Sequence, residues 1–447
     1  MDFAKRAHDH SFHYDWIIRS LLDIDFYKLL MLQCIWLFFP TTVIRFSLMN
    51  RTKRVRLANI IDEAQLRAQL DHVRSLSFRE NELVWLAGNK FYGKRDIFRP
   101  IFIGWLRDLR LPDYQLSRTK DGQWELVFEG TWVEVTLWEI YAIVIVNTLR
   151  NRAGLAMMNK SELDIFYALG KARAWEKVKI FREFENLNLT DFGTRRRHEF
   201  LWQKWVVELF AEMLGPKNFS GTSNALLAME LGLEAKGTNA HELPMVLAAL
   251  AYGEHVLEST VLRGEKVRES QYDVLHYWQK TYGDVLTVFL PDTFGTTQFL
   301  KNAPEWLASW RGGRPDSKDP FLATEEFAAW WQFHKQDPRE KLSLPCDGLD
   351  APVIADLHRK YYGHIGIGYG LGTFGTNDFR GCHPRGLTDL DPISLVCKVS
   401  HVFVNGIWIP AVKLSDNYEK ATGPKDMVAE YRAIFGTEGV ANAPVVV

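Results

Sequence analysis

From about residue 185 onward the chain repeats one local pattern: a short apolar run, a polar glycine-containing turn, and a helical stretch. Strand-like VLTVFL (285–290) and HIGIGY (364–369) precede such turns, and helical HEFLWQKWVVELFAEML (198–214) and ALLAMELGL (225–233) follow others. About seven repeats predict an α/β barrel or a doubly wound sheet. In a barrel these turns gather on one face, where the site is built. The turns are DFGTRRR (191–197), GTSN (221–224), GTNAH (237–241), PDTFGT (291–296), RGGRPDS (311–317), CDGLD (346–350) and GYGLGTFG (368–375).

The two ends of the chain have a different texture. Asp62–Ser77 has apolar residues at intervals of three and four and predicts an amphipathic helix. The alternating, aromatic stretch 123–145 predicts a hairpin that closes near Glu129-Gly130, followed by a buried segment. Near the C-terminus, two strand-like runs flank Asn405-Gly406, a strong hairpin signal. We expect this last hairpin to pack outside the barrel, on the N-terminal domain.

The charge of the chain limits its partners. Lys plus Arg number 54 and Asp plus Glu 55, which gives a net charge of −1. This balance argues against broad binding to nucleic acid or to an anionic membrane, so an anionic ligand needs a local cluster of cations. The longest apolar stretches, Leu29–Phe39 and Ile140–Val146, are shorter than the roughly 20 residues that span a bilayer.

The N-terminus lacks the apolar core of a signal peptide, and the four cysteines show no CxxC spacing. We therefore expect neither a disulfide framework nor a zinc site, and a reduced, cytoplasmic location. His8, His10 and His13 lie close together, and a mobile polar terminus is favoured there over a metal site.

Three of the turns have the composition of an anion site. GYGLGTFG offers four glycines that let main-chain N–H groups approach a phosphate, although tight turns use glycine just as often. DFGTRRR supplies three guanidinium groups suited to carboxylate or phosphate oxygens, with a solvated helix start as the alternative. RGGRPDSKDP places carboxylates beside Arg314, a pattern that suits sugar hydroxyls, Mg²⁺ or simply a capped turn.

His241 stands in GTNAHE (237–242), at the start of an apolar helical run. A neutral imidazole can act as a base or a nucleophile near neutral pH, and a carboxylate is needed to orient its second nitrogen. Asp292, from another turn of the predicted barrel, is the candidate. Taken alone, His241 is better explained by a structural role, because most of the 13 histidines in such a chain are structural.

In order along the chain, these motifs resemble those of the nicotinate phosphoribosyltransferase family. The resemblance begins at LLDIDFYKLLMLQ (21–33), passes through DFGTRRR, GTSN, GTNAHE, RPDSKDP and CDGLD, and ends at VKLSD (412–416). It implies transfer of a phosphoribosyl group from phosphoribosyl pyrophosphate to nicotinate, coupled to ATP hydrolysis, with Mg²⁺ as cofactor. The product is nicotinate mononucleotide, a precursor of NAD.

The resemblance also implies an architecture. Residues 1–150, with about 393–447, would form a mixed α/β sandwich-like domain that the C-terminal hairpin completes. Residues 151–392 would form an irregular α/β barrel that carries the phosphate-binding loops. The family further implies a homodimer whose active sites are shared between subunits.

Residue by residue, the motifs imply specific roles. His241 would be the phosphohistidine and Asp292 the acid beside it. Phe192 and Tyr27 would sandwich the pyridine ring, with Tyr27 supplied by the other subunit. The remaining implied contacts are Arg195 and Arg314 around the ring and its carboxylate; Asp316 on the ribose; Gly348, Gly370, Gly372 and Thr373 around the 5′-phosphate; and Lys398, Lys413 and Lys420 near the pyrophosphate or ATP phosphates.

Ser223 bears on the choice of base. The related nicotinamide enzyme has an aspartate in this turn, which would repel a carboxylate, so serine favours the acid. Two departures from the family pattern stand out: Lys318 replaces a glycine in RPDSKDP, and the turn SDNYEKATGP makes the role of Lys420 less secure.

Four alternatives remain open at this point. A nicotinamide phosphoribosyltransferase is disfavoured by Ser223, and a quinolinate enzyme by its lack of need for ATP or a phosphohistidine. A barrel glycosidase would use Asp292 and Asp316 as paired carboxylates. A non-catalytic scaffold would have no need of so many phosphate loops and cations.

Overall fold

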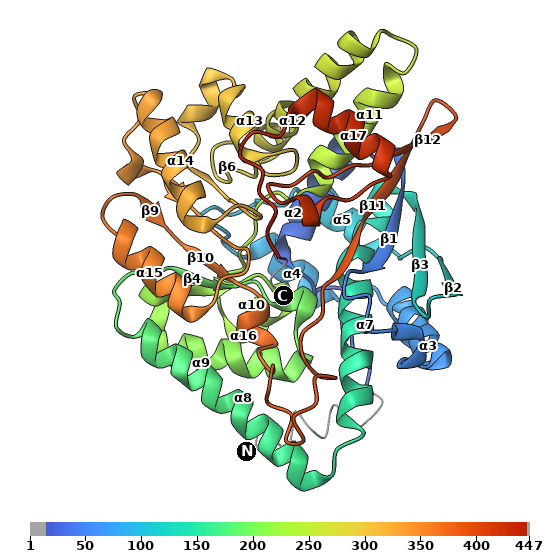
Figure 1. Ribbon diagram of the computed structural model, residues 1–447, viewed down its shortest axis with the longest axis vertical. Coiled ribbons are helices and arrows are strands. Elements are labelled where there is room, and N and C mark those ends of the chain that lie inside the picture. Colours follow the sequence, from blue (N-terminus) through green and yellow to red (C-terminus); the bar gives the residue numbers. More distant parts are fainter. Residues whose placement is uncertain (1–14, 445–447) are drawn as a thin grey trace.

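The structure is a computed structural model that describes residues 15–444, so His8, His10 and His13 lie outside the described residues. The chain is a mixed α/β protein with three sheets (Figure 1). In Figure 1 one antiparallel sheet stands at the right, and the short parallel strands lie at the centre and left, with helices around them.

The antiparallel sheet joins the two ends of the chain. Its strand order is β12-β11-β1-β3-β2, so the C-terminal hairpin pairs directly with the N-terminal strand β1. Asn405 and Gly406 both have positive φ (49° and 86°), as a tight hairpin between β11 and β12 requires. The predicted hairpin and its position on the N-terminal part are confirmed, while the residue limits of the two domains stay a prediction. The strands are β1 (Val43–Asn50), β2 (Tyr114–Arg118), β3 (Trp124–Thr131), β11 (Leu395–Val404) and β12 (Ile407–Pro410).

The hairpin expected to close near Glu129-Gly130 is wrong. β3 runs unbroken through both residues, and the turn lies before it, where Gly122 has a φ of 77°. The segment after β3 is helical and forms α6 (Trp132–Val135) and α7 (Trp138–Leu155). Because α7 is buried on nearly all sides, its sequence lacks the 3.6-residue alternation of an amphipathic helix.

Residues 132–155 are long and apolar enough to cross a bilayer by length and composition alone. Within this fold, however, 94% of the most apolar window is buried by other parts of the protein. In Figure 1, α7 stands beside β1 and β11, and its side chains form part of the main core. It is a core helix.

The parallel strands follow the order of a barrel. One sheet has the order β10-β4-β5 and the other β6-β7-β8-β9. Only Gly368 separates β9 from β10, and Thr222 at the end of β5 forms a parallel bridge with Ala235. Within residues 15–444, ladder hydrogen bonds do not continue from Ala235 to β6, so the ring is interrupted there. The strands are β4 (Leu189–Asp191), β5 (Phe219–Thr222), β6 (Val288–Phe289), β7 (Gly312–Gly313), β8 (Leu342–Ser343), β9 (Gly366–Ile367) and β10 (Tyr369–Leu371).

Helices connect these strands and cover them, as the repeated pattern predicts. The expected helix at 62–77 is α3 (Glu63–Ser75), whose first turn is capped by the Asp62 side chain accepting from the Gln65 N–H. The helices that matter below are α2 (Phe26–Phe38), α8 (Lys160–Phe181), α9 (Phe200–Asn218), α10 (Ala225–Leu231), α11 (Glu242–Glu254), α12 (Thr260–Tyr282), α14 (Pro320–Phe333), α15 (Ala351–Tyr361), α16 (Thr373–Thr376) and α17 (Lys425–Phe435).

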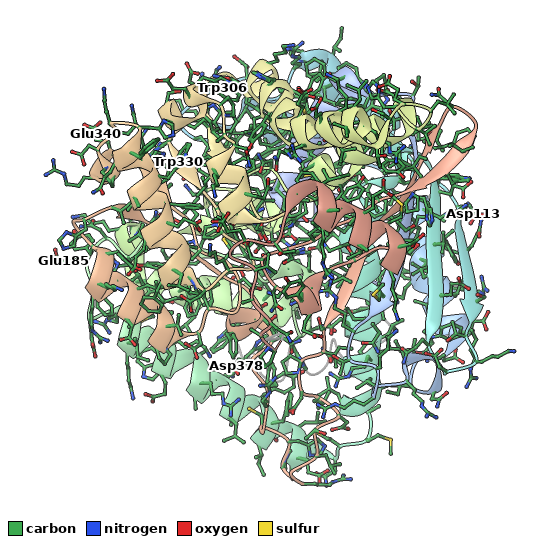
Figure 2. The ribbon with its side chains drawn as sticks, turned by 45° about the horizontal axis from the view of Figure 1, so that its top comes forward. Asp113, Glu185, Trp306, Trp330, Glu340 and Asp378 are labelled. Carbon is green, nitrogen blue, oxygen red and sulfur yellow. The ribbon has the colours of Figure 1, made fainter. Side chains whose placement is uncertain are left out.

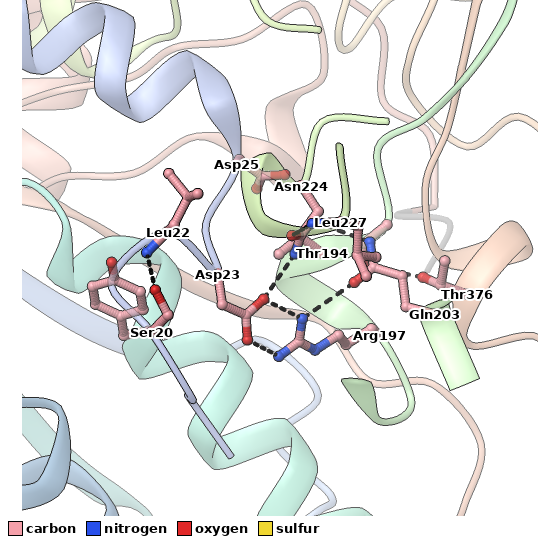
Figure 3. A network of polar contacts seen from close by, with 12 residues as sticks. Ser20, Leu22, Asp23, Asp25, Thr194, Arg197, Gln203, Asn224, Leu227 and Thr376 are labelled. Atoms are coloured by element: carbon pink, nitrogen blue, oxygen red, sulfur yellow. Dashed lines mark hydrogen bonds and ion pairs between the residues drawn. The ribbon is translucent and has the colours of Figure 1, made fainter. Parts of the chain in front are cut away.

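A buried ion pair fastens the N-terminal segment to the barrel. Arg197 donates two 2.7 Å hydrogen bonds to the carboxylate of Asp23, and both side chains are fully buried (Figure 3). Asp23 also accepts from Asn224 (2.8 Å), and Arg197 donates to Gln203 (3.2 Å). The network thus joins the segment before α2 to the turns that follow β4 and β5.

We predict that Arg197→Ala lowers the free energy of unfolding by about 3–5 kcal/mol, because it leaves the Asp23 charge buried without its partner. Denaturant unfolding followed by circular dichroism measures the change. Arg339→Ala is the control, since it breaks only an exposed pair with Asp337 and should leave the midpoint unchanged. Equal midpoints for wild type and Arg197→Ala would contradict the prediction.

Candidate active site

The polar turns of the parallel strands meet in one cleft of about 1060 Å³. Phe192 and Arg195 reach it after β4, Arg314 and Asp316 after β7, and Gly348 after β8. Strand β11, from the other domain, contributes Lys398. The predicted site residues that line the cleft are Phe192, Arg195, His241, Arg314, Asp316, Gly348, Gly372, Thr373, Lys398, Lys413 and Lys420.

Two smaller cavities adjoin this cleft and share Arg195 and Arg314 with it. One, of about 400 Å³, lies against His241 and Lys398. The other, of about 330 Å³, is lined by Tyr27, Phe192 and Ser223, and so combines two aromatic rings with two guanidinium groups. Its composition suits a flat, negatively charged aromatic molecule.

His241 lies directly before α11, and its ring is held from one side. Its Nε2 is 2.8 Å from Asp292 Oδ1, and its Nδ1 is 3.7 Å from Asp316 Oδ2. Burial, assisted by the nearby charge of Lys413, outweighs the attraction of Asp292 and lowers the pKa of His241 to about 4. The ring is therefore neutral at pH 7. With the proton on Nε2, donated to Asp292, the Nδ1 lone pair is left free on the other side of the ring.

Asp292 is fully buried and behaves as the orienting acid that the sequence predicts. Burial opposes its ionisation, but attraction to His241 and Lys413 wins and holds the pKa of Asp292 well below its usual range. Its second oxygen accepts a 2.6 Å hydrogen bond from Ser317 and lies 3.6 Å from Lys413 Nζ. Asp292 does not line the cleft itself, so its contact with a ligand is through His241.

The cleft contains two further cations, one from a predicted motif and one that no motif indicated. Arg196, from the DFGTRRR turn, and Arg51, just beyond β1, both line it. Arg51 also donates to the backbone oxygen of Lys420 (2.9 Å), and Lys420 forms an ion pair with Asp347. Lys420 therefore lies in the cleft despite the unusual turn that carries it. The local sequence around Arg51 does not indicate a binding site. Arg51 reaches the cleft only because the antiparallel sheet places β1 beside the barrel.

Gly370 differs from the other predicted phosphate-binding residues. Its N–H donates to the Pro345 oxygen (3.0 Å), and Gly370 does not line the cleft. A Cβ at this position would lie 2.5 Å from the Phe192 ring and 2.8 Å from Cys346 Sγ. Glycine is required here because the aromatic ring packs directly on the backbone, so the structure assigns Gly370 to supporting Phe192.

The expectation that Tyr27 comes from a second subunit is wrong for this chain. Tyr27 is at the start of α2 and lines the 330 Å³ cavity together with Phe192 of the same chain. The reason is the tight attachment of the preceding segment. The Phe26 N–H donates to the backbone oxygen of Ser223 (2.6 Å), and Asp25 forms an antiparallel bridge with Asn224.

The surroundings of Ser223 also differ from the expectation. A serine at this turn was expected to keep a carboxylate away from the ligand, but Asp25 supplies one from the N-terminal segment. The Ser223 hydroxyl donates to Asp25 Oδ1 at 2.5 Å, and Arg195 Nε lies 3.7 Å from Asp25 Oδ2. The charge near the 330 Å³ cavity, called the ring cavity below, therefore depends on two segments nearly 200 residues apart.

Lys318, which replaces a glycine, causes no backbone strain. Its φ is not positive, and its ammonium group donates to Thr297 (2.9 Å) and pairs with Glu326 at 2.5 Å. The neighbouring Ser317 still holds Asp292. The altered residue thus anchors the loop to α14 from outside the cleft.

The available metal ligands and the cysteines define what further chemistry the side chains offer. The described part of the chain contains no group of three or more His, Cys, Asp or Glu side chains that could hold a metal ion. All four cysteines are free thiols. Asp316 and Asp347 are the carboxylates that line the cleft, which suits a hydrated Mg²⁺ that takes most of its ligands from water and substrate phosphates.

Comparison with known proteins assigns the family. Residues 187–438 match the nicotinate phosphoribosyltransferase (NAPRTase) family, and residues 22–147 match the NAPRTase N-terminal domain. The chain belongs to the nicotinate phosphoribosyltransferase family. It is therefore a phosphoribosyltransferase enzyme.

Solved structures of the family have the same fold. A nicotinate phosphoribosyltransferase from Vibrio cholerae is 27% identical, with a TM-score of 0.80 and 96% of each chain covered. One from Porphyromonas gingivalis is 24% identical (TM-score 0.79; 94% of this chain and 100% of that one). A putative nicotinate phosphoribosyltransferase from Saccharomyces cerevisiae is 23% identical (TM-score 0.77; 95% and 99%). The last two support the fold alone.

Lys398 is the cation of the cleft whose charge changes near neutral pH. Burial lowers the pKa of Lys398 to about 7; Glu139 acts in the opposite sense, and Lys413 and Arg195 lower it further. Lys398 is thus charged below about pH 7 and neutral above it. It lies between the large cleft and the 400 Å³ cavity, on strand β11.

We predict that the contribution of Lys398 to anion binding is present at about pH 6 and lost by about pH 9. The dissociation constant of inorganic pyrophosphate, measured by calorimetry, should favour wild type over Lys398→Met at the lower pH by about 1.5–3 kcal/mol. The ratio of the dissociation constants of Lys398→Met and wild type should approach one at the higher pH. The ligand's own titration cancels in this ratio. Lys301→Met, at an exposed lysine, is the control; a ratio independent of pH would contradict the prediction.

Proposed function

We propose that this enzyme transfers the phosphoribosyl group of phosphoribosyl pyrophosphate to nicotinate, coupled to ATP hydrolysis through a phosphohistidine at His241. The observation that carries the proposal is the position of the His241 ring. Asp292 holds one of its nitrogens while the ring itself lines the cleft that also contains the cations and the glycine turns. This arrangement suits a nucleophile that attacks a phosphate group in the cleft. A histidine with a purely structural role would not need to line the cleft.

The aromatic cavity supports a pyridine carboxylate as the acceptor. Phe192 and Tyr27 line the same 330 Å³ space, and Arg195 and Arg314 border it. Arg314 is oriented by the 2.8 Å hydrogen bond that it donates to the backbone oxygen of Asn239. Ring faces would orient the base so that its nitrogen approaches C1 of the ribose, which lowers the entropic part of the barrier.

The large cleft suits the phosphate-bearing substrates. Breaking the bond from C1 to pyrophosphate builds positive charge on the ribose and negative charge on the leaving group. Lys398, Lys413 and Arg196 line the cleft and would stabilise the leaving group with little reorganisation. Asp316 would contact the ribose hydroxyls, and Gly348, Gly372 and Thr373 the 5′-phosphate. Mg²⁺, with Asp316 and Asp347 as its available carboxylates, would neutralise phosphate charge.

ATP coupling would use the free nitrogen of His241. Nδ1 would attack the γ-phosphorus of ATP, the bond to the bridging oxygen would break, and ADP would leave. The proton on Nε2 remains in its hydrogen bond to Asp292, which stabilises the charge that forms on the ring. The new phosphoryl group would add negative charge and draw nearby cations into position for the sugar substrate.

The main alternatives have less support. A glycosidase needs two carboxylates facing one substrate, but Asp292 is fully buried and bonded to His241. Nicotinamide is the closer rival as a base, and the two arginines at the ring cavity favour the acid. A homodimer stays a prediction, and the position of Tyr27 removes the need for a shared ring cavity.

We predict that the purified enzyme forms nicotinate mononucleotide from nicotinate and phosphoribosyl pyrophosphate, faster with ATP than without it. Nicotinate and nicotinamide supplied together, with products separated by chromatography, test the choice of base directly. Product from nicotinamide alone, or none from either base, would overturn the proposal. Rates equal with and without ATP would remove the coupling only.

We predict that γ-labelled ATP transfers acid-labile label to wild type and none to His241→Asn, because asparagine lacks the nucleophilic nitrogen. His255→Asn is the matched control, since His255 lies at the other end of α11, paired with Glu258. The control should keep the label. Label retained on His241→Asn would place the phosphoryl acceptor elsewhere.

A further inference from the structure

Among the described residues, Asp25 is the one carboxylate on the lining of the ring cavity. It precedes α2, only two residues beyond Asp23 of the buried network, and its side chain is 3% exposed (Figure 3). Tyr27, Phe192 and Ser223 border the same space. A buried acid where an aromatic carboxylate is proposed to bind requires a physical explanation, because two ionised carboxylates repel each other at short range.

The hydrogen bonds around Asp25 leave one oxygen unused. Its Oδ1 accepts the only proton of the Ser223 hydroxyl, at 2.5 Å. Its Oδ2 is buried and has no hydrogen-bond partner among residues 15–444, with Arg195 Nε at 3.7 Å. In this state Ser223 has no proton to offer a ligand and can only accept a hydrogen bond.

A carboxylate ligand cannot use that state, because it too can only accept hydrogen bonds. A proton on Asp25 reverses the direction of the pair. The acid then donates to Ser223 Oγ, and the Ser223 O–H becomes free to donate to the ligand. The amide of a neutral base, in contrast, donates hydrogen bonds and fits the ionised state of the pair.

The groups that face Asp25 act in both directions. Burial raises the pKa of Asp25, and Arg195, Ser223 and Thr194 oppose this, while Glu139 adds to it. Asp191 and Tyr27 are also close enough to interact with it electrostatically. The other cations on the cavity lining are Lys236 and Arg314. The incoming carboxylate would add a further negative charge, which favours the protonated acid.

We propose that Asp25 and Ser223 form a proton-linked specificity pair: nicotinate binds together with one proton, which is held on Asp25, while Ser223 donates to the carboxylate of the substrate. The proposal rests on nicotinate being the base. It makes Asp25 a positioning residue that acts through Ser223, and it ties the preference for acid over amide to pH.

The decisive variant is Asp25→Asn, whose NH₂ group can donate to Ser223 Oγ at any pH. Calorimetry of nicotinate binding in buffers of different ionisation enthalpy measures the protons taken up. Above the pKa of Asp25, wild type should take up about one proton and lose up to about tenfold in affinity per pH unit. Asp25→Asn should take up none and show no such loss. Asp113→Asn removes the same charge at an exposed site (Figure 2) and should behave as wild type.

Steady-state kinetics give a second measurement if Asp25→Asn folds poorly. In wild type, rising pH should raise the KM for nicotinate and strengthen competition by nicotinamide, and Ser223→Ala should weaken both effects because its hydroxyl donor is absent at every pH. Nicotinate that binds wild type without proton uptake, or an Asp25→Asn variant with the wild-type pH profile, would overturn the inference and leave the proposed reaction intact. Failure of wild type to bind or convert nicotinate at any pH would overturn both.

Discussion

Charge compensation in the cleft is the constraint on which this structure depends. Arginine and lysine side chains from several turns and from β11 converge there, although the chain as a whole is nearly neutral. Cations in such a space repel each other and are costly to desolvate unless carboxylates pair with them. The fold provides a carboxylate for several: Asp25 near Arg195, Asp292 near Lys413, and Asp347 at Lys420.

The same principle extends into the core next to the site. Lys28, on α2, is fully buried between Glu139 of α7 and Glu242, the residue after His241. Glu242 also accepts hydrogen bonds from Trp132 and Thr136. This cluster fixes the start of α11, and with it the position of His241, relative to the N-terminal domain. A reactive ring and its phosphate-binding loops thus stay aligned because buried charges hold separate elements together.

Much of the site was predictable because its residues lie in short turns with distinctive composition. His241, Arg195, Arg314, Asp316 and the glycines of the last turns line one cleft or support it, as the barrel pattern and the family resemblance imply. The failures have physical causes. Gly370 was assigned to phosphate, but its neighbour in space is the ring of Phe192, and no local pattern encodes such a contact. The second strand predicted after Glu129-Gly130 is the helix α6, and the buried segment that follows is the helix α7, whose sequence shows no helical period because it has no polar face.

The sequence alone determined the alternation of strands and helices, the tight hairpin at Asn405-Gly406, and which turns carry chemically capable side chains. These properties follow from backbone preferences and hydrophobic period, which are local. Only the tertiary structure decided that Asp25 lies against Ser223, that Arg51 enters the cleft, and that Tyr27 belongs to the same chain's cavity. Those outcomes depend on packing between segments far apart in the chain, where the energy of a contact is fixed by distance in space rather than by position in the sequence.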